Sequence, residues 1–93
     1  MVHILAADQV GIAKTFASKS ANKFEGIDWR LDNDGLPLLD GCVMALACRL
    51  FSVLPGGDHA ILAGEVERIA ASNEVAPMVY AGRRMTRPEG ETT

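Results

Sequence analysis

The chain has 93 residues and a net charge of −3 at neutral pH, which limits it to one small domain and excludes a basic surface for nucleic acid. Hydrophobic residues make up 48% of it and charged residues 23%, a balance typical of a folded globular domain rather than a disordered chain. No apolar run reaches the roughly 20 residues that span a bilayer, and the first residues lack the features of a signal peptide, so no membrane association is expected.

Two elements are predicted at the start of the chain. Val2 to Leu5 is a short apolar run that predicts a strand. From Asp8 to about Ser18 the apolar residues recur every three or four positions, which predicts a helix. Gly11 weakens this helix by about 1 kcal/mol relative to alanine, so it indicates either close backbone packing or a neutral, tolerated glycine.

The segment from Ser18 to Leu39 is polar and rich in turn residues, which predicts an irregular connection. Residues 33–35, Asn-Asp-Gly, indicate a turn, and Pro37 is expected to stop any regular element. Trp29 lies in this connection either as an anchor of the core or as part of a binding surface, and the sequence does not decide between the two.

Lys23 and Phe24 form the one cluster in this connection that suggests a binding role. The lysine could hold a phosphate, and the phenylalanine could pack on a flat ring. The ordinary alternative is a solvated lysine beside an anchoring aromatic side chain, and the residues by themselves favour that alternative.

The stretch from Cys42 to Ala71 is predicted to form one long β-hairpin. Two apolar runs flank residues 55–57, Pro-Gly-Gly, whose backbone preferences suit a turn. Asp58 is assigned to the turn, with its side chain accepting backbone N–H bonds, and His59 opens the second arm. The first arm is apolar on both faces, so it should be covered on both sides. A helix is the alternative for a short apolar run, but the β-branched residues and the turn favour a strand.

The hairpin also implies a pairing register. With the turn at residues 55–57, the expected pairs are Leu54 with His59, Leu50 with Ala63, and Arg49 with Gly64. In this register the glycine would leave space for the arginine side chain. The far end of the second arm carries charged residues and is expected to emerge into water.

Cys42 and Cys48 are the only two cysteines. Six positions apart on one strand they would lie about 20 Å from each other, too far for a disulfide. We interpret them as small buried hydrophobes in a reducing cytoplasm. No CxxC or HxxxH spacing is present, so no metal site is expected.

The last part of the chain is expected to be a loop over residues 72–76, then a short apolar run followed by two arginines. A domain spanning residues 1–86 is predicted to end in a disordered tail over residues 87–93. These features predict a small, mainly β domain with one helix, which does not name a function.

Four segments, taken in order, resemble the flavin reductase family, whose members have the FMN-binding split-barrel fold. The segments are VHILAADQVGIAKTFASKSANKFEGIDW, GLPLLDGCVMALACRL, GGDHAILAGEVE and PMVYAGRRM. They look like the family's strand–helix segment ending in Lys-Phe-x-Gly, its Pro-Leu-Leu-x-Gly segment, its Gly-Asp-His signature and its closing Pro-Leu-x-Tyr segment. The resemblance covers Val2 to about Met85, and the four segments together are far more specific than any one of them.

The resemblance implies an antiparallel split β-barrel of the Greek-key type that lacks the N-terminal barrel strands. The family's first half, which also supplies a loop that contacts the flavin, has no counterpart in this sequence. We therefore expect the chain alone to expose unpaired edges and to dimerise, aggregate or bind flavin poorly. Two smaller departures are Ala47, where many members carry Glu, and Met85, where an aromatic residue is common.

The resemblance also implies a site and a reaction. Lys23 and Phe24 match positions beside the flavin, His59 matches a histidine near the flavin and nicotinamide rings, and Tyr80 and Arg84 match positions close to the cofactor. His59 is the candidate catalytic residue. The implied reaction is hydride transfer from NADH or NADPH to FMN or FAD, with the reduced flavin supplied to a partner monooxygenase. Family members are homodimers, so a homodimer is implied.

Three functions remain open at this point. The first, which we favour, is a flavin reductase subunit or a fragment of one. The second is a flavin-binding split-barrel protein without reductase turnover. The third is a truncated paralogue whose hairpin serves only as an interaction surface.

Overall fold

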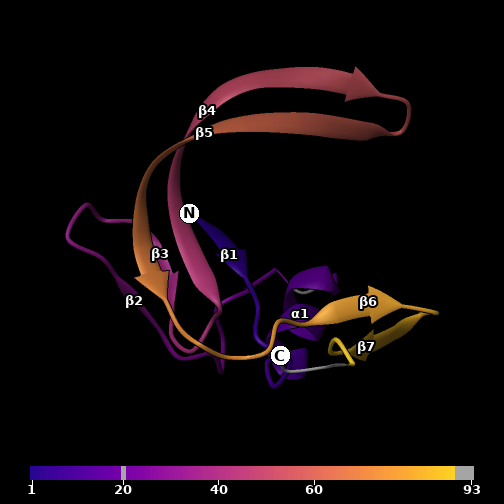
Figure 1. The fold of residues 1–93 in the computed structure, drawn as a ribbon. Helices are drawn as coiled ribbons and strands as arrows, with labels where there is room; N and C mark the ends of the chain where they lie inside the picture. Colours follow the sequence, from indigo (N-terminus) through magenta and orange to yellow (C-terminus); the bar gives the residue numbers. More distant parts are fainter. Residues whose placement is uncertain (20, 90–93) are drawn as a thin grey trace.

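The computed structural model describes residues 1–19 and 21–89 (Figure 1). Its elements in chain order are β1 (Val2–Ile4), α1 (Val10–Ala17), β2 (Trp29–Leu31), β3 (Pro37–Leu39), β4 (Met44–Gly56), β5 (His59–Ser72), β6 (Val79–Ala81) and β7 (Arg84–Thr86). All strand pairs are antiparallel and form three sheets, ordered β1-β4-β5, β2-β3 and β6-β7. The prediction of a mainly β fold with one helix is confirmed. Of the predicted tail, residues 87–89 have no regular secondary structure and residues 90–93 lie outside the described residues.

The predicted first strand and helix are both present, with slightly shorter bounds. Gln9 precedes α1 and is buried, and its side chain makes two bonds instead of capping the helix. Its Oε1 accepts the Ala6 N–H at 2.8 Å, and its Nε2 donates to the Asp40 carbonyl at 2.8 Å. A Cβ added at Gly11 would meet nothing within 4 Å. The interpretation of close backbone packing at Gly11 is therefore wrong, and the glycine is simply tolerated. No helix in the described ranges is long and apolar enough to cross a membrane.

The connection after α1 contains a β-hairpin that the sequence did not predict. Trp29 lies in β2 rather than in a loop, and Pro37 begins β3 opposite Leu31 instead of stopping an element. A proline is tolerated at the first residue of a strand, where no ladder hydrogen bond from its nitrogen is needed. The predicted turn at residues 33–35 is present, and Asp32 Oδ1 stabilises it by accepting the N–H groups of Asp34 and Leu36, both at 2.9 Å.

The long hairpin of β4 and β5 is confirmed as a hairpin, but its predicted register is wrong. Gly56 pairs with His59, so the turn is the two residues Gly57 and Asp58, and Pro55 lies within β4. Gly57 has φ +69° at the first central position, which matches a tight two-residue hairpin turn. Leu54 consequently pairs with Ile61 instead of His59.

The expected pairing of Arg49 with Gly64 is also wrong. Register shifts in β4 place Leu50 opposite Gly64 and Arg49 opposite Glu65, and the Arg49 and Glu65 side chains form a 3.2 Å ion pair. The space left by Gly64 faces Cys48, because a Cβ built on this glycine would lie 3.3 Å from the Cys48 Cβ. The glycine therefore accommodates the cysteine and not the arginine.

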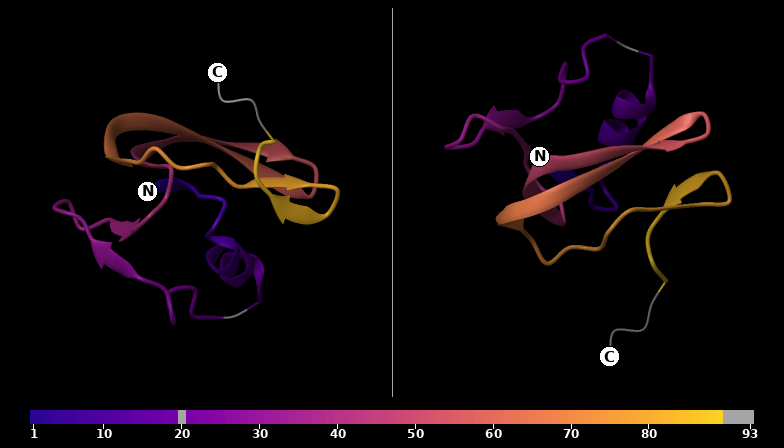
Figure 2. Two further views of the ribbon diagram at one scale, coloured as in Figure 1. Left: turned by 60° about the horizontal axis from the view of Figure 1, so that its bottom comes forward. Right: turned by 90° about the horizontal axis from the view of Figure 1, so that it is seen from above.

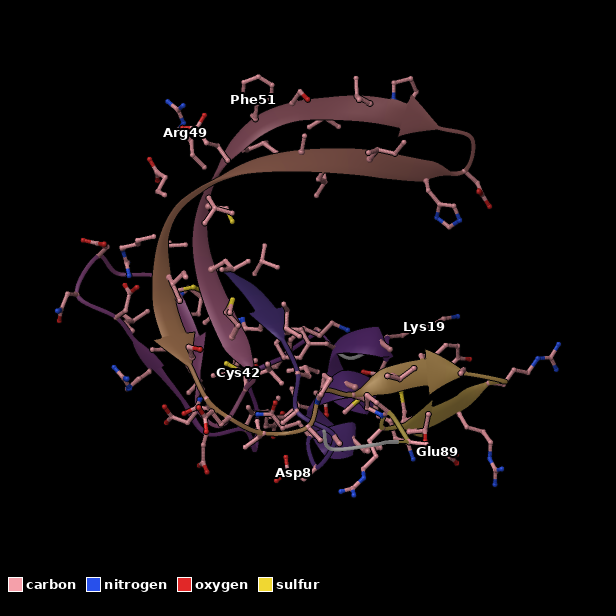
Figure 3. The ribbon with its side chains drawn as sticks, viewed as in Figure 1. Asp8, Lys19, Cys42, Arg49, Phe51 and Glu89 are labelled. Carbon is pink, nitrogen blue, oxygen red and sulfur yellow. The ribbon has the colours of Figure 1, made fainter. Side chains whose placement is uncertain are left out.

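The buried residues of the long hairpin lie only in the inner half of β4, since no residue of β5 is fully buried. Ala45 and Ala47 on β4 are buried, whereas Leu50 is 62% exposed and Phe51 is 71% exposed. The prediction that this strand is covered on both sides is thus wrong for its outer half. The three register shifts coincide with a bend, as bulges produce, and Phe51 projects away from the rest of the molecule (Figure 3). The small hairpins β2–β3 and β6–β7 lie on opposite sides of the molecule in every view (Figure 2).

Both cysteines are free, and they differ in burial. Cys42 is completely buried and forms the core with Leu38 and Ala45, while Cys48 is half-buried. Burial raises the pKa of the Cys42 thiol, which keeps it protonated near neutral pH. Within residues 1–19 and 21–89, no group of histidine, cysteine or acidic side chains is arranged to hold a metal ion.

The β2–β3 hairpin is tied to β5 by ion pairs at its turn. Arg68 Nη2 lies 2.6 Å from Asp32 Oδ2 and 2.6 Å from Asp34 Oδ2. The hydrogen bond from Arg68, with the backbone N–H bonds of Leu36 and Asp34, lowers the pKa of the Asp32 carboxyl from 3.8 to about 2. We call Asp32, Asp34 and Arg68 the turn clamp.

The turn clamp predicts an acid-dependent loss of stability. The pKa of Asp32 is lower in the folded state than in the unfolded state. The ionised Asp32 carboxylate therefore contributes fully to the free energy of unfolding above pH 3.8, and this contribution is lost as the pH falls toward 2. Asp32→Asn should therefore weaken this part of the pH dependence, measured as the urea midpoint from pH 5 to 2. Arg68→Met should lower stability more than the control Arg30→Met, because the Arg30–Asp40 pair is 3.6 Å long and exposed. An unchanged pH slope in Asp32→Asn would contradict the assignment.

The hairpin turn predicts opposite effects at two glycines. Gly57→Ala should destabilise the protein by about 1–2 kcal/mol, because an L-residue at positive φ bears roughly this penalty. The control Gly11→Ala should instead stabilise it by up to about 1 kcal/mol, because alanine is the better helix former and the site is open. Urea unfolding of both variants measures the difference, and equal effects at the two positions would show that the φ of Gly57 does not matter.

Candidate functional site

Lys23 and Phe24 lie in the turn that follows α1. The Lys23 ammonium donates a hydrogen bond to the Ser18 carbonyl at the end of the helix. The Phe24 N–H donates to Asn22 Oδ1 at 3.1 Å, so the asparagine side chain shapes this turn. Both predicted residues are half-buried and come from one short segment.

Phe24 is the centre of an aromatic cluster, which we define as Phe16, Phe24 and Trp29. Its ring meets the Phe16 ring edge to face, with centroids 5.6 Å apart at 88°, and meets the Trp29 ring at 4.7 Å and 41°. Trp29 remains 42% exposed, so the cluster offers an aromatic surface to the outside. Of the two roles that the sequence left open for Trp29, this arrangement favours the binding surface.

An apolar hollow lies beside this cluster, between α1, β1 and β3. Its narrow part has a volume of about 90 Å³, and its wider part about 290 Å³. The two parts share four lining residues: Met1, His3, Phe16 and Leu39. Phe24 lines the narrow part, and Ile12 lines the wider part.

His3 is the polar side chain of this hollow, and the sequence analysis missed it. Its Nε2 accepts the Leu39 N–H at 3.0 Å. Burial, and to a smaller extent the N-terminal ammonium, lower the pKa of its imidazole. The available signal was a histidine within the apolar run of β1, but its partner lies 36 positions away and is not visible in the local pattern.

His59 lies at the tip of the β4–β5 hairpin, away from the hollow. Its Nε2 is 3.3 Å from Asp58 Oδ1, and the two side chains are 83% and 92% exposed. The Asp58 carboxylate thus contacts the imidazole itself, in contrast to its predicted role toward backbone N–H groups. This contact can give the ring a preferred direction.

Tyr80 and Arg84 lie on the β6–β7 hairpin, and both are exposed. Tyr80 pairs with Met85, and Arg84 pairs with Ala81 across the hairpin. The segment before β6 is attached to the link between β1 and α1, with Ala7 N–H donating to the Ala76 carbonyl at 2.8 Å. These two side chains therefore share one small hairpin.

The structure brings together some of the predicted site residues and separates others. Lys23 and Phe24 are adjacent, and Tyr80 and Arg84 share a hairpin, but His59 lies at the tip of β4–β5 (Figure 1). Among the interactions described for this chain, none links His59, Tyr80 or Arg84 to the aromatic cluster. The predicted site is therefore divided over three surfaces.

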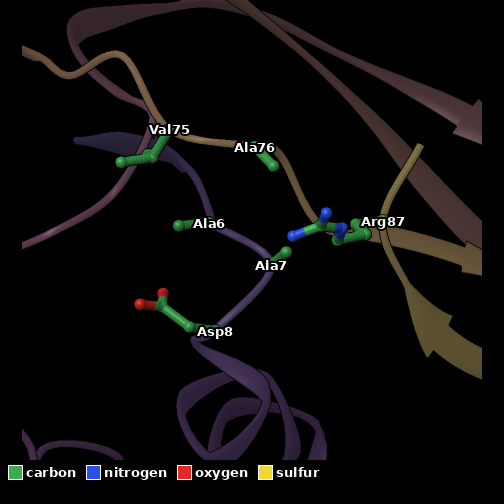
Figure 4. Close-up of a pocket in the computed structure, with 6 residues that line it drawn as sticks. All are labelled: Ala6, Ala7, Asp8, Val75, Ala76 and Arg87. Carbon is green, nitrogen blue, oxygen red and sulfur yellow. The ribbon is translucent and has the colours of Figure 1, made fainter. Parts of the chain in front are cut away.

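Another opening lies where the β1–α1 link meets residues 75–76 and Arg87. It has a volume of about 290 Å³ and is lined by Ala6, Ala7, Asp8, Val75, Ala76 and Arg87. Figure 4 shows the Arg87 side chain extending toward Ala7, with the Asp8 carboxylate projecting from the same link. No predicted site residue lines this opening.

Solved structures share this fold. The NADH:FAD oxidoreductase of Streptomyces globisporus, solved with NAD and FAD fragments, is 33% identical with a TM-score of 0.87, and the similarity covers 98% of this chain and 56% of that one. The homologue of nitrilotriacetate monooxygenase component B from Mycobacterium thermoresistibile is 31% identical with a TM-score of 0.81, covering 94% of this chain and 50% of that one.

Curated relatives match by sequence as well. A flavin reductase of Pseudomonas putida is 37% identical over 79 residues, 85% of this chain and 46% of the relative. The actinorhodin polyketide dimerase of Streptomyces coelicolor is 39% identical over 83 residues, 89% of this chain and 47% of the relative. The chain thus spans about half the length of these relatives. The family model described as "Flavin reductase like domain" matches residues 1–89, so the chain belongs to the family of flavin reductase like domains.

Proposed function

We propose that this chain takes part in the reduction of a flavin by NADH or NADPH, as the reductase of a two-component flavin-dependent monooxygenase. The observation that carries the proposal is the family match over residues 1–89. Relatives named as reductase subunits of flavin-dependent monooxygenases support the partner. FMN and FAD both remain candidates, because similar proteins include an FMN reductase (NADH) and an NADH:FAD oxidoreductase.

The flavin ring is proposed to pack beside Phe24. Flat rings pack well on aromatic faces, and the aromatic cluster has an exposed member in Trp29. Lys23 adds a cation next to the cluster, which suits a phosphate group. The residues present in this turn therefore fit a ring with an anionic side group.

The other predicted residues are proposed to act on the nicotinamide side. When bound, the flavin would supply the chemistry by accepting a hydride from the nicotinamide. His59 would donate an N–H to the nicotinamide carboxamide or to negative charge that develops at the reacting rings. Asp58 would keep the imidazole oriented through its 3.3 Å contact. Tyr80 and Arg84 would contact polar groups of the cofactor, for which their exposure leaves them accessible.

Flavin binding and turnover separate the three candidate functions. Trp29 is the only tryptophan, so quenching of its fluorescence by added FMN or FAD measures binding. Oxidation of NADH or NADPH in the presence of added flavin would identify the chain as a reductase. Binding without oxidation selects a flavin-binding protein without turnover, and neither activity selects an interaction surface.

Two phenylalanine variants test where the flavin packs. Phe24→Ala should weaken flavin binding, whereas Phe51→Ala should not, because Phe51 projects from the outer half of β4 and is 71% exposed. Equal flavin affinities for the two variants would overturn the placement beside Phe24.

The protein is further proposed to be a cytoplasmic homodimer. Its support is the apolar surface on the outer half of β4–β5, where Leu50, Phe51 and Leu62 are more than half exposed. Exposed surfaces of this kind favour association. Sedimentation velocity over a range of concentrations tests it, and Leu62→Lys should shift the equilibrium toward monomer. A concentration-independent monomer would refute the dimer.

A further inference from the structure

His3 connects two sheets that share no strand pairing. It lies on β1, opposite Ala45 of β4, whereas Leu39 lies on β3 in the separate β2–β3 sheet. The bond from Leu39 N–H to His3 Nε2 is 3.0 Å long, and Leu39 is only 4% exposed. A buried N–H that loses its acceptor bears a desolvation cost, so this bond matters for the position of β3.

The bond requires a neutral imidazole. An imidazole nitrogen that accepts a hydrogen bond carries no proton, so the single proton of His3 is on Nδ1. In the imidazolium both ring nitrogens are donors. The Leu39 N–H and a protonated Nε2 would then face each other as two donors, and the bond would break.

Few charges surround His3. The side chains that line the hollow with it are apolar: Met1, Leu5, Ile12, Phe16, Phe24, Pro37 and Leu39. Charged groups on the neighbouring elements have other contacts: Lys23 donates to the Ser18 carbonyl, Asp40 pairs with Arg30, and Lys14 lines a different opening. The charge that acts on His3 is the N-terminal ammonium, which also disfavours the imidazolium.

We propose that His3 is a pH-sensitive latch, whose protonation breaks its bond to Leu39 and moves β3 away from β1 at this point, while Leu38 in the core and the bond from Gln9 to Asp40 limit the movement. The other end of this hairpin stays attached, because the turn clamp joins Asp32 and Asp34 to Arg68 on β5. The change is therefore a local opening and not global unfolding. It stands independently of the proposed flavin chemistry, although it moves the strand that carries Trp29.

Trp29 reports directly on the latch. It pairs with Leu39 across the β2–β3 hairpin, and its ring contacts Phe24. Opening the latch should separate Trp29 from the aromatic cluster and expose it, which shifts its emission to longer wavelength. Trp29 is the only tryptophan, so all tryptophan emission of the full chain comes from this residue.

The test is a titration of Trp29 emission from pH 8 to pH 4.5 in the full chain without flavin. We expect one reversible transition with a midpoint below 6.5, because the closed latch disfavours the proton. His3→Gln should abolish it, since a glutamine carbonyl accepts the Leu39 N–H without titrating in this range. The control His59→Gln, which replaces the only other histidine, should leave the transition unchanged.

A second readout places the change at the bond itself. The Leu39 amide resonance should move with the same midpoint as the Trp29 emission in wild type and should not titrate in His3→Gln. A transition that persists in His3→Gln, or an emission that is constant from pH 8 to pH 4.5 in wild type, would overturn the latch. Far-ultraviolet circular dichroism that changes together with the emission would also overturn it, because the opening would then be global.

Discussion

Replacing His59 with alanine should lower kcat/KM for NAD(P)H by about 10- to 100-fold, which corresponds to about 1.4 to 2.7 kcal/mol of transition-state stabilisation. The physical reason is the loss of the N–H donor that we propose for His59, whose Nε2 lies 3.3 Å from Asp58 Oδ1 at the hairpin tip. Flavin affinity should change less, because the proposed flavin surface is the aromatic cluster around Phe24. The measurement requires a form of the protein that oxidises NAD(P)H.

The separate effects of His59→Ala on kcat and on KM identify what His59 does. If it only positions the nicotinamide, His59→Ala raises KM and leaves kcat nearly unchanged, whereas a loss in kcat as well means that it stabilises the transition state. Asp58→Asn provides a graded comparison, because it keeps the imidazole and weakens the contact that directs it, so its loss should be smaller. An unchanged kcat/KM in His59→Ala would make this histidine an ordinary exposed residue of a hairpin turn.

Replacing Leu38 with alanine should destabilise the fold by about 2–5 kcal/mol, as expected for a large-to-small change in a packed core. Leu38 is 4% exposed and packs in the core with Cys42 and Ala45. Small domains are stable by only about 5–15 kcal/mol in total, so this one variant would remove a large share. Urea unfolding, followed by circular dichroism, measures the loss.

Leu50→Ala is the matched control for that experiment. It is the same substitution on the outer half of β4, where the leucine is 62% exposed, so at protein concentrations at which the chain is monomeric it should change stability by about 0.5 kcal/mol or less. A large loss at Leu50 would mean that the outer half of the hairpin is packed against another surface in solution. A small loss at Leu38 would mean that the inner half of β4 does not hold the core.

Elements with a strong local pattern could be predicted from the sequence. The helix has apolar residues at helical spacing, and α1 indeed spans Val10–Ala17. The two long apolar runs around a turn became the β4–β5 hairpin. The short strands β2 and β3 were missed because they lie in a polar, turn-rich segment in which Pro37 reads as a stop. The strands β6 and β7 were missed because the segment that contains them was interpreted only as an apolar run followed by two arginines.

The candidate site could be predicted only in part. Lys23 and Phe24 are neighbours in the chain, so their proximity needed no fold. The sequence could not show that Phe16 and Trp29 enclose Phe24, because both contacts depend on how α1 and β2 pack. Likewise His3 was overlooked, since only the approach of β3 to β1 gives its Nε2 a partner.

By itself the sequence determined the helix, the existence of the long hairpin and the turn at residues 33–35, because each follows from backbone preferences within a few neighbouring positions. Tertiary structure alone decided the hairpin register, since residues 55–57 contain several turn formers and strand pairing selects Gly57 and Asp58. It also decided that the inner half of β4 is buried while Leu50 and Phe51 are exposed, because burial depends on which distant elements pack against a strand. For the same reason only the folded chain couples His3 to Leu39 and Asp32 to Arg68, two contacts that each join residues 36 positions apart.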